Sequence, residues 1–131
     1  MSVNPKEYIG SIAKVRFKYF NSNTNRMGFK VRPMLIIGAE KEYFPCDFNV
    51  LPISKISKSQ HISSEYDIEL NIDQCNKLSL HYCPSYIRVH KQSYAYSTDV
   101  DQNIISNLKQ IDTELYNQIQ SVHRKFNDTL F

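Results

Sequence analysis

Apolar and basic positions alternate along residues 11–20, SIAKVRFKYF, so that one face is apolar and the other carries Lys14, Arg16 and Lys18. A repeat of two is the period of a half-buried strand. The next stretch, NSNTNRMG at 21–28, is rich in residues with strong turn chemistry. It leads into a second apolar segment, FKVRPMLIIG at 29–38. Together these segments predict a hairpin with a long polar tip.

Three shorter strand patterns follow. Residues 42–54, EYFPCDFNVLPIS, combine aromatic and branched side chains with two prolines, which predicts a bent or edge strand ending near Pro52. Residues 66–71 and 85–92 alternate like short strands, and the polar stretch 54–65 is typical of an exposed loop. The interval 72–84 fits either a turn of helix or a further loop.

The last segment has the period of a helix, because apolar residues recur there at steps of three and four. They are Val100, Ile104, Leu108, Ile111, Leu115, Ile119, Val122 and Phe126. This spacing predicts one amphipathic helix over about 99–126, with Thr98 or Asp99 as its N-cap. Such an apolar stripe is typical of a core or dimer face.

Strands first and a helix last predict an α+β fold, in which a small, bent antiparallel sheet close to a barrel spans about 8–96. The 131 residues, 41% of them hydrophobic, fit one domain over 1–131. No apolar run is long enough for a membrane span, and the start lacks the pattern of a secretory signal. We therefore expect a cytoplasmic protein that does not bind membranes.

Charge is unevenly distributed along the chain. The net charge is only +3, but the charged residues between 11 and 32 are all basic: Lys14, Arg16, Lys18, Arg26, Lys30 and Arg32. An acid-free segment of this kind favours a polyanionic partner such as nucleic acid, although a solvated strand face has the same composition.

The three cysteines are odd in number and show no paired short spacing, which indicates reduced, partly buried thiols. Cys75, His81 and Cys83 can be drawn as a metal site, but a structural site needs a fourth ligand at recognisable spacing. We expect no metal and no cofactor.

Several short motifs now occur in a characteristic order. They are Gly10-Ser-Ile at the start of the first strand, KVRP at 30–33 before an apolar strand, VLPIS at 50–54, SYIRVHK at 85–91 and the closing amphipathic helix. In this the chain resembles the MazF/PemK family of toxin ribonucleases, from about Gly10 to Phe126. The resemblance implies an SH3-like barrel, related to CcdB, that forms homodimers. It also implies metal-independent, sequence-specific cleavage of single-stranded RNA, inhibition by a cognate antitoxin, and DNA binding as the toxin–antitoxin complex.

The resemblance also implies site residues. The arginine of the family's Arg-Pro pair falls on Arg32, and the hydroxyl residue two positions after the third strand's proline falls on Ser54. These would stabilise the phosphate while a ribose 2′-hydroxyl attacks phosphorus, leaving a cyclic phosphate and a 5′-hydroxyl. The expected RNA contacts are Asn21, Asn23, Asn25, Arg26, Lys30, Lys55, Lys58 and Ser85. Tyr19, Phe20 and Phe29 would either stack on bases or belong to the core.

Other interpretations remain open. Arg32 would be structural if it paired with Asp67 or Glu69. The chain would be a binding protein rather than an enzyme if it acted on a macromolecular target, as CcdB toxins do. A third interpretation is a basic nucleic-acid-binding domain without chemistry.

Overall fold

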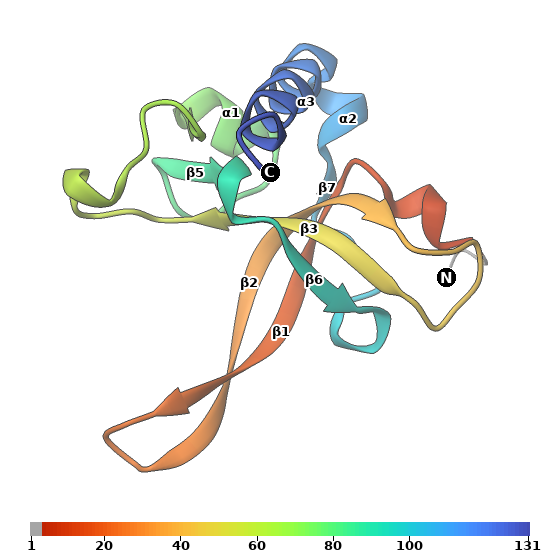
Figure 1. The fold of residues 1–131 in the computed structure, drawn as a ribbon, viewed down its shortest axis with the longest axis vertical. Helices are drawn as coiled ribbons and strands as arrows, with labels where there is room; N and C mark the ends of the chain where they lie inside the picture. Colours follow the sequence, from red (N-terminus) through yellow and green to blue (C-terminus); the bar gives the residue numbers. More distant parts are fainter. Residues whose placement is uncertain (1–3) are drawn as a thin grey trace.

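The computed structural model describes residues 4–131, and in this range the protein is α+β. Seven strands form one curled antiparallel sheet, a half-barrel, accompanied by a few helices (Figure 1). The strands are β1 (Ser11–Asn21), β2 (Arg26–Ala39), β3 (Asp47–Ser54), β4 (Asp67–Leu70), β5 (Ser85–Arg88), β6 (Ser93–Tyr96) and β7 (Ser106–Asn107). The α-helices are α1 (Ile72–Lys77), α2 (Leu108–Ile111) and α3 (Thr113–Asn127). Short 3-10 turns are η1 (Pro5–Tyr8), η2 (Ser59–His61), η3 (Val89–Lys91) and η4 (Ser97–Asp99).

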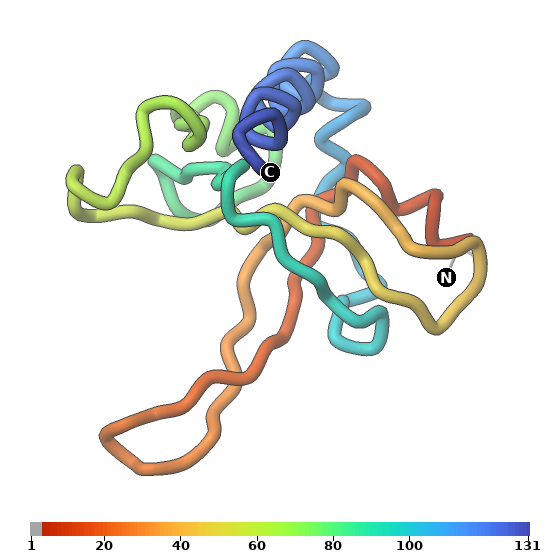
Figure 2. Tube along the Cα trace, viewed as in Figure 1, coloured from red at the N-terminus to blue at the C-terminus, as the bar shows by residue number. Residues whose placement is uncertain are grey.

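The first hairpin is confirmed, but its tip is shorter than predicted. β1 and β2 pair without interruption from Ile12–Leu35 to Asn21–Arg26, so that half of 21–28 is strand and residues 22–25 form the turn. The turn is closed by Asn25, whose φ of 55° is left-handed. The Asn21 side chain also accepts hydrogen bonds from the Asn23 and Thr24 amides. The far half of the hairpin, residues 16–31, extends past the other elements and projects from the body as a two-stranded arm (Figure 2).

The sheet curls where β3 leaves β2. The ladder between them runs from Ala39–Phe48 to Met34–Pro52, after which β3 pairs with β5 at Ile53–Ile87. The last pair of the β2–β3 ladder contains Pro52, and proline has no amide hydrogen to donate. β3 therefore forks from one partner to the other at Pro52, and it begins at Asp47 rather than near residue 42 as predicted.

Both faces of the sheet are covered in the body of the protein. On one face the sheet packs with α1, α2 and α3 into a cluster that includes Ile12, Leu35 and Ile119. On the other face Ala13, Met34 and neighbouring apolar residues form a second cluster. Figure 1 shows the three helices together at the end of the molecule opposite to the arm.

The predicted helix over 99–126 is wrong in its first half. Val100 forms a bridge with Val15 of β1, and the Ile105 amide donates to the Ile12 carbonyl at 2.8 Å. The free edge of β1 needs hydrogen-bond partners, and pairing with 100–107 satisfies it where a helix would not. The long helix begins only at Thr113, capped by Asp112 and not by Thr98 or Asp99.

Gly10 is required where the chain enters β1. Its φ is +96°, and a Cβ there would lie 2.6 Å from the Lys109 Cβ. Only glycine combines this conformation with so close an approach. Lys109 donates its amide to the Gly10 carbonyl at 3.2 Å, so this contact holds the start of β1 against α2.

Candidate nucleic-acid interface

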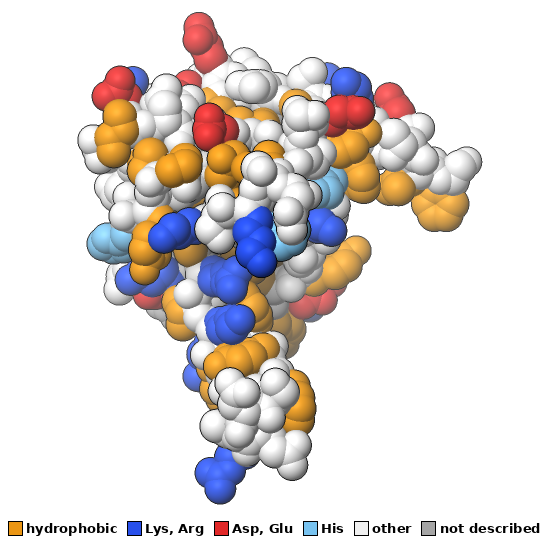
Figure 3. Space-filling model, turned by 90° about the vertical axis from the view of Figure 1, so that its left-hand side faces the viewer, with side chains coloured by type: hydrophobic (Ala, Val, Ile, Leu, Met, Phe, Trp, Pro, Cys, Tyr) orange, Lys and Arg blue, Asp and Glu red, His pale blue; other side chains and the backbone are white. Residues whose placement is uncertain are grey.

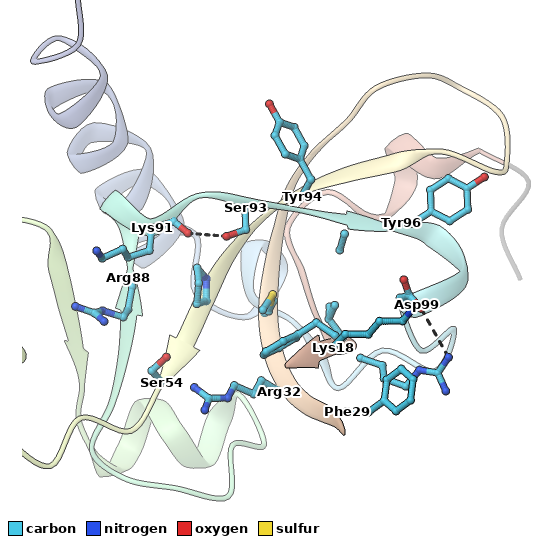
Figure 4. Close-up of a pocket in the computed structure, with 16 residues that line it drawn as sticks. Lys18, Phe29, Arg32, Ser54, Arg88, Lys91, Ser93, Tyr94, Tyr96 and Asp99 are labelled. Atoms are coloured by element: carbon cyan, nitrogen blue, oxygen red, sulfur yellow. Dashed lines mark hydrogen bonds and ion pairs between the residues drawn. The ribbon is translucent and has the colours of Figure 1, made fainter. Parts of the chain in front are cut away.

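A groove of about 850 Å³ lies between the base of the arm, the end of β3 and β6. Figure 4 shows Ser54, Arg32, Arg88 and Lys91 at one end of it and Lys18, Phe29 and Asp99 at the other, with Tyr94 and Tyr96 along β6. Its cationic lining residues are Arg16, Lys18, Arg32, Arg88 and Lys91. Asp99 is the one acid in the lining, and it lies 3.9 Å from Arg16. The groove is therefore suited to an anionic ligand.

The structure brings Arg32 and Ser54 together, as the resemblance implies. Arg32 lies inside β2 opposite Val15, and Ser54 is the last residue of β3. Both lie two positions beyond the last β2–β3 pair, Met34–Pro52. In Figure 4 the Arg32 guanidinium points toward Ser54. Both residues also line a second pocket of about 370 Å³, so they form the wall between the two cavities.

Arg32 does not form the structural ion pair that the alternative interpretation required. Asp67 pairs with Arg88, and the Glu69 carboxylate accepts a hydrogen bond from the Tyr86 hydroxyl. The ion pairs within residues 4–131 leave Arg32 without a carboxylate partner. Its guanidinium carbon lies 6.0 Å from the centre of the Phe17 ring, and the residue is exposed. The charge of Arg32 is thus available to a ligand.

Arg88 is a groove residue that the sequence analysis missed. Its Nε donates to Asp67 Oδ1 at 3.1 Å and its Nη2 to the His61 carbonyl at 3.0 Å. The Asp67 side chain is fully buried, whereas 22% of the Arg88 side chain is exposed. Asp67 and Arg88 are cross-strand partners on β4 and β5. The available signal in the sequence was a pair of opposite charges on two short predicted strands. To recognise them as partners, however, one must know the register between the two strands, which the sequence does not give.

His90 lies beside this ion pair. Its Nδ1 is 3.8 Å from Asp67 Oδ1 and has no hydrogen-bond partner. Burial lowers the pKa of His90, and the Arg88 charge lowers it further, although the Asp67 charge acts in the opposite direction. His90 is therefore mainly neutral at pH 7, and Arg88 remains the cation that balances Asp67.

The predicted RNA contacts are divided between the arm and the site. Lys55 lines the second pocket with Arg32 and Ser54. Asn23, Asn25 and Arg26 are exposed at the tip of the arm, at a distance from both cavities along the strands. Lys30 lies on the arm with its Nζ 4.5 Å from the centre of the Tyr19 ring.

The remaining predicted contacts offer less to a ligand. The Asn21 side-chain oxygen is engaged in the turn. Lys58 is exposed in the loop after β3 and lines neither cavity. Ser85 lines the second pocket, but it is only 4% exposed and its hydroxyl donates to the Tyr82 carbonyl. It therefore serves the local fold, because its hydroxyl already has a partner.

The second pocket adds groups that the sequence analysis did not assign to the site. The pocket is lined by apolar side chains, among them Val31 and Ile105, and by polar side chains that include Lys14 and His81. The prediction had placed His81 only in a hypothetical metal cluster. The segment 78–84 that carries it follows α1, which resolves the open assignment of 72–84 in favour of a helical turn.

The hypothetical metal cluster is not formed. Cys75 and Cys83 both lie with Sγ 3.6 Å from the Leu70 carbonyl. A hydrogen bond with Cys75 and desolvation raise the pKa of Cys83 to about 11, which disfavours the thiolate that a metal would need. Among residues 4–131, no group of three or more His, Cys, Asp or Glu side chains could hold a metal ion.

Figure 3 shows how charge is distributed over one face of the molecule. Lys and Arg side chains gather in the middle of this face, next to the projecting arm, and most Asp and Glu side chains lie toward the other end. The face thus offers a cationic surface that continues from the arm to the groove.

No protein-family model matches the chain, and no curated protein matches its sequence. Over residues 4–131, none of the helices combines the length and the apolar character needed to cross a membrane.

Proposed function

We propose that this protein is a metal-independent endoribonuclease of the MazF/PemK type, with an SH3-like barrel, that cleaves single-stranded RNA in the Arg32–Ser54 groove. The observation that supports this most directly is the position of Arg32. Its guanidinium has no carboxylate partner in the described structure, points toward Ser54, and shares its groove with four further cations. An unpaired arginine beside a hydroxyl, in a cationic groove, suits the binding of a phosphodiester.

The phosphate would lie between Arg32 and Ser54. The guanidinium fork matches two phosphate oxygens, and the Ser54 hydroxyl adds one hydrogen bond. Arg88 supplies a second guanidinium, held in place by Asp67. Donors fixed before the reaction stabilise the charge that develops on the phosphoryl oxygens in the transition state.

In the reaction, the 2′-oxygen loses its proton and bonds to phosphorus, the bond from phosphorus to the 5′-oxygen breaks, and that oxygen takes up a proton. The products are a cyclic phosphate and a 5′-hydroxyl. His81 is the candidate for accepting the first proton, because it lines the second pocket with Arg32 and Ser54 and imidazole exchanges protons near neutral pH. Arg32 is normally protonated and suits donation toward the departing oxygen.

The remaining parts of the proposal follow from the resemblance. The RNA would contact Lys30, Lys55 and the tip of the arm, and sequence preference would come from unpaired bases read beside the groove. A cognate antitoxin would occupy the same groove and compete with RNA. The functional form would be a cytoplasmic homodimer.

The test is incubation of the purified protein with a long single-stranded RNA in EDTA, followed by mapping of the new ends. We expect new ends with 2′,3′-cyclic phosphates and 5′-hydroxyls. Arg32→Ala should lose about 2–4 kcal/mol of transition-state stabilisation, the effect of one strong oxyanion donor. Arg124→Ala, an exposed arginine on α3, is the matched control and should cleave like the wild type.

Two outcomes would decide against the proposal. Wild-type protein that binds RNA without cutting it would favour the alternative, a binding barrel without chemistry. Equal cleavage by wild type and Arg32→Ala would remove Arg32 from the site. For His81, the readout is the cleavage rate: His81→Gln should slow cleavage by roughly 10²- to 10⁴-fold, the contribution of one general base, and leave RNA binding unchanged.

A further inference from the structure

One face of the arm carries two rows of side chains that extend away from the candidate site. Paired residues of an antiparallel ladder share one face, and the pairs Lys18–Phe29, Arg16–Val31 and Lys14–Pro33 therefore form two parallel rows. β1 supplies a row of cations and β2 a row of apolar side chains, and the pair Phe20–Met27 completes this two-row face toward the tip.

The apolar row is open to solvent. The exposed fractions are 59% for Met27, 53% for Phe29 and 59% for Val31, and Phe20 is 58% exposed. Soluble proteins rarely leave a contiguous row of large apolar side chains uncovered without a binding role. The cation row is also open, with 57% of the Arg16 side chain exposed.

We propose that the two-row face binds an extended single strand of nucleic acid, with phosphates along the cation row and unpaired bases against the apolar row. Alternate residues of a strand lie about 6.7 Å apart, which is comparable to the separation of successive phosphates in an extended strand. The Arg16 guanidinium lies 4.6 Å from the centre of the Phe29 ring. Rings and guanidinium planes are the groups on which unpaired bases stack.

The charge of this face argues for that occupant over others. No acidic residue occurs between 11 and 32, so a second copy of the chain that paired through the same face would add further cations there. A duplex keeps its bases stacked and paired, and would leave the apolar row without a partner. A single strand satisfies both rows at once.

The two-row face is continuous with the candidate site. Arg16, Lys18 and Phe29 also line the groove, and Lys14, Val31 and Pro33 line the second pocket. That the bound strand is the RNA cut at Arg32 rests on the proposed function. The face would then hold nucleotides that flank the cleavage site, and longer strands would bind more tightly than shorter ones.

The experiment measures binding without cleavage. Single-stranded 2′-deoxy oligonucleotides of mixed sequence, in a short and a long form, are titrated by fluorescence anisotropy over a range of salt concentrations. Each cation contributes about 0.7 to the slope of log affinity against log salt for a single strand. Arg16→Gln/Lys18→Gln should therefore lower the slope by roughly 1.4. Phe29→Ala should weaken binding roughly 5- to 150-fold with little change in slope.

The matched control is Arg124→Gln/Lys125→Gln, which removes the same charge from α3, at the end of the molecule opposite to the arm (Figure 1). Thermal melting of each variant verifies folding. The proposal is overturned if the arm variants bind the single strand as tightly as this control does, or if a duplex of equal length binds more tightly than the single strand. It is also overturned if the substitutions weaken binding to anionic vesicles but leave binding to the oligonucleotides unchanged. Failure of the proposed function would appear separately, as an absence of RNA cleavage by a wild type that still binds the deoxy strand.

Discussion

The hairpin β1–β2 has two halves that are built alike and used differently. In the body half, Ile12 and Leu35 are paired and both are fully buried. In the arm half, Phe20 and Met27 are paired in the same register, yet they are 58% and 59% exposed. The pairing register continues unbroken from one half to the other. What changes is whether other elements cover the two faces.

The difference shows that an alternation with a period of two tells which side chains share a face of the sheet. It does not tell whether that face is buried. The body half is covered by α1–α3 on one side and by β6 and the segment around Val100 on the other. The arm extends past these elements. Apolar residues of the arm are therefore open to solvent and accessible to a ligand.

The largest expected contrast concerns the two ion pairs. Asp67→Ala should destabilise the body by about 3–5 kcal/mol, because it leaves the partly buried Arg88 without its carboxylate. Asp99→Ala, at the base of the arm, should cost at most about 1 kcal/mol because both partners are solvated. Urea denaturation of the two variants checks this, and equal costs would contradict the contrast.

A similar contrast is expected between apolar residues of the two halves. Leu35→Ala should cost about 2–5 kcal/mol, since it opens a cavity in a buried cluster. Met27→Ala should stay within about 0.5 kcal/mol of the wild type because the side chain is mostly solvated. The two free energies of unfolding can be compared directly, and a large loss from Met27→Ala would show that the arm is covered in solution.

The smallest effect is a pH dependence that belongs to the body. Burial lowers the pKa values of His90 and His123. Below about pH 6.5 the unfolded chain therefore binds protons that the folded protein does not, and stability falls as the pH is lowered toward the folded-state values. His90→Gln should flatten the fall in urea midpoint between neutral and mildly acidic pH.

Much of the strand pattern could be predicted from the sequence because it is local. Residues 11–20, 66–71 and 85–92 alternate, and each contains a strand. The C-terminal prediction failed at residues 100–107. Val100 and Ile104 have helical spacing, but this segment instead forms hydrogen bonds with the edge of β1, which is far away in the sequence. Local spacing was reliable only from Thr113, where no strand edge competes.

The candidate site shows the same division. Arg32 and Ser54 were predicted through a resemblance, and the structure places them on one groove. Arg88 and His81 were not predicted, because their place in the site depends on the pairing of β4 with β5 and on the path of the chain after α1. Phe20 and Phe29 were assigned to either base stacking or the core, and their exposure excludes the core.

The sequence by itself determined the alternation of the first hairpin, the acid-free row of cations from Lys14 to Arg32, and the Arg-Pro pair. Tertiary structure decided that β3 leaves β2 at Pro52, that 100–107 pairs with β1, and that the arm stays uncovered. The physical reason is that hydrogen-bond partners and covering side chains come from segments far away along the chain. A strand's own residues set its faces, and its neighbours in space decide which of them meet solvent.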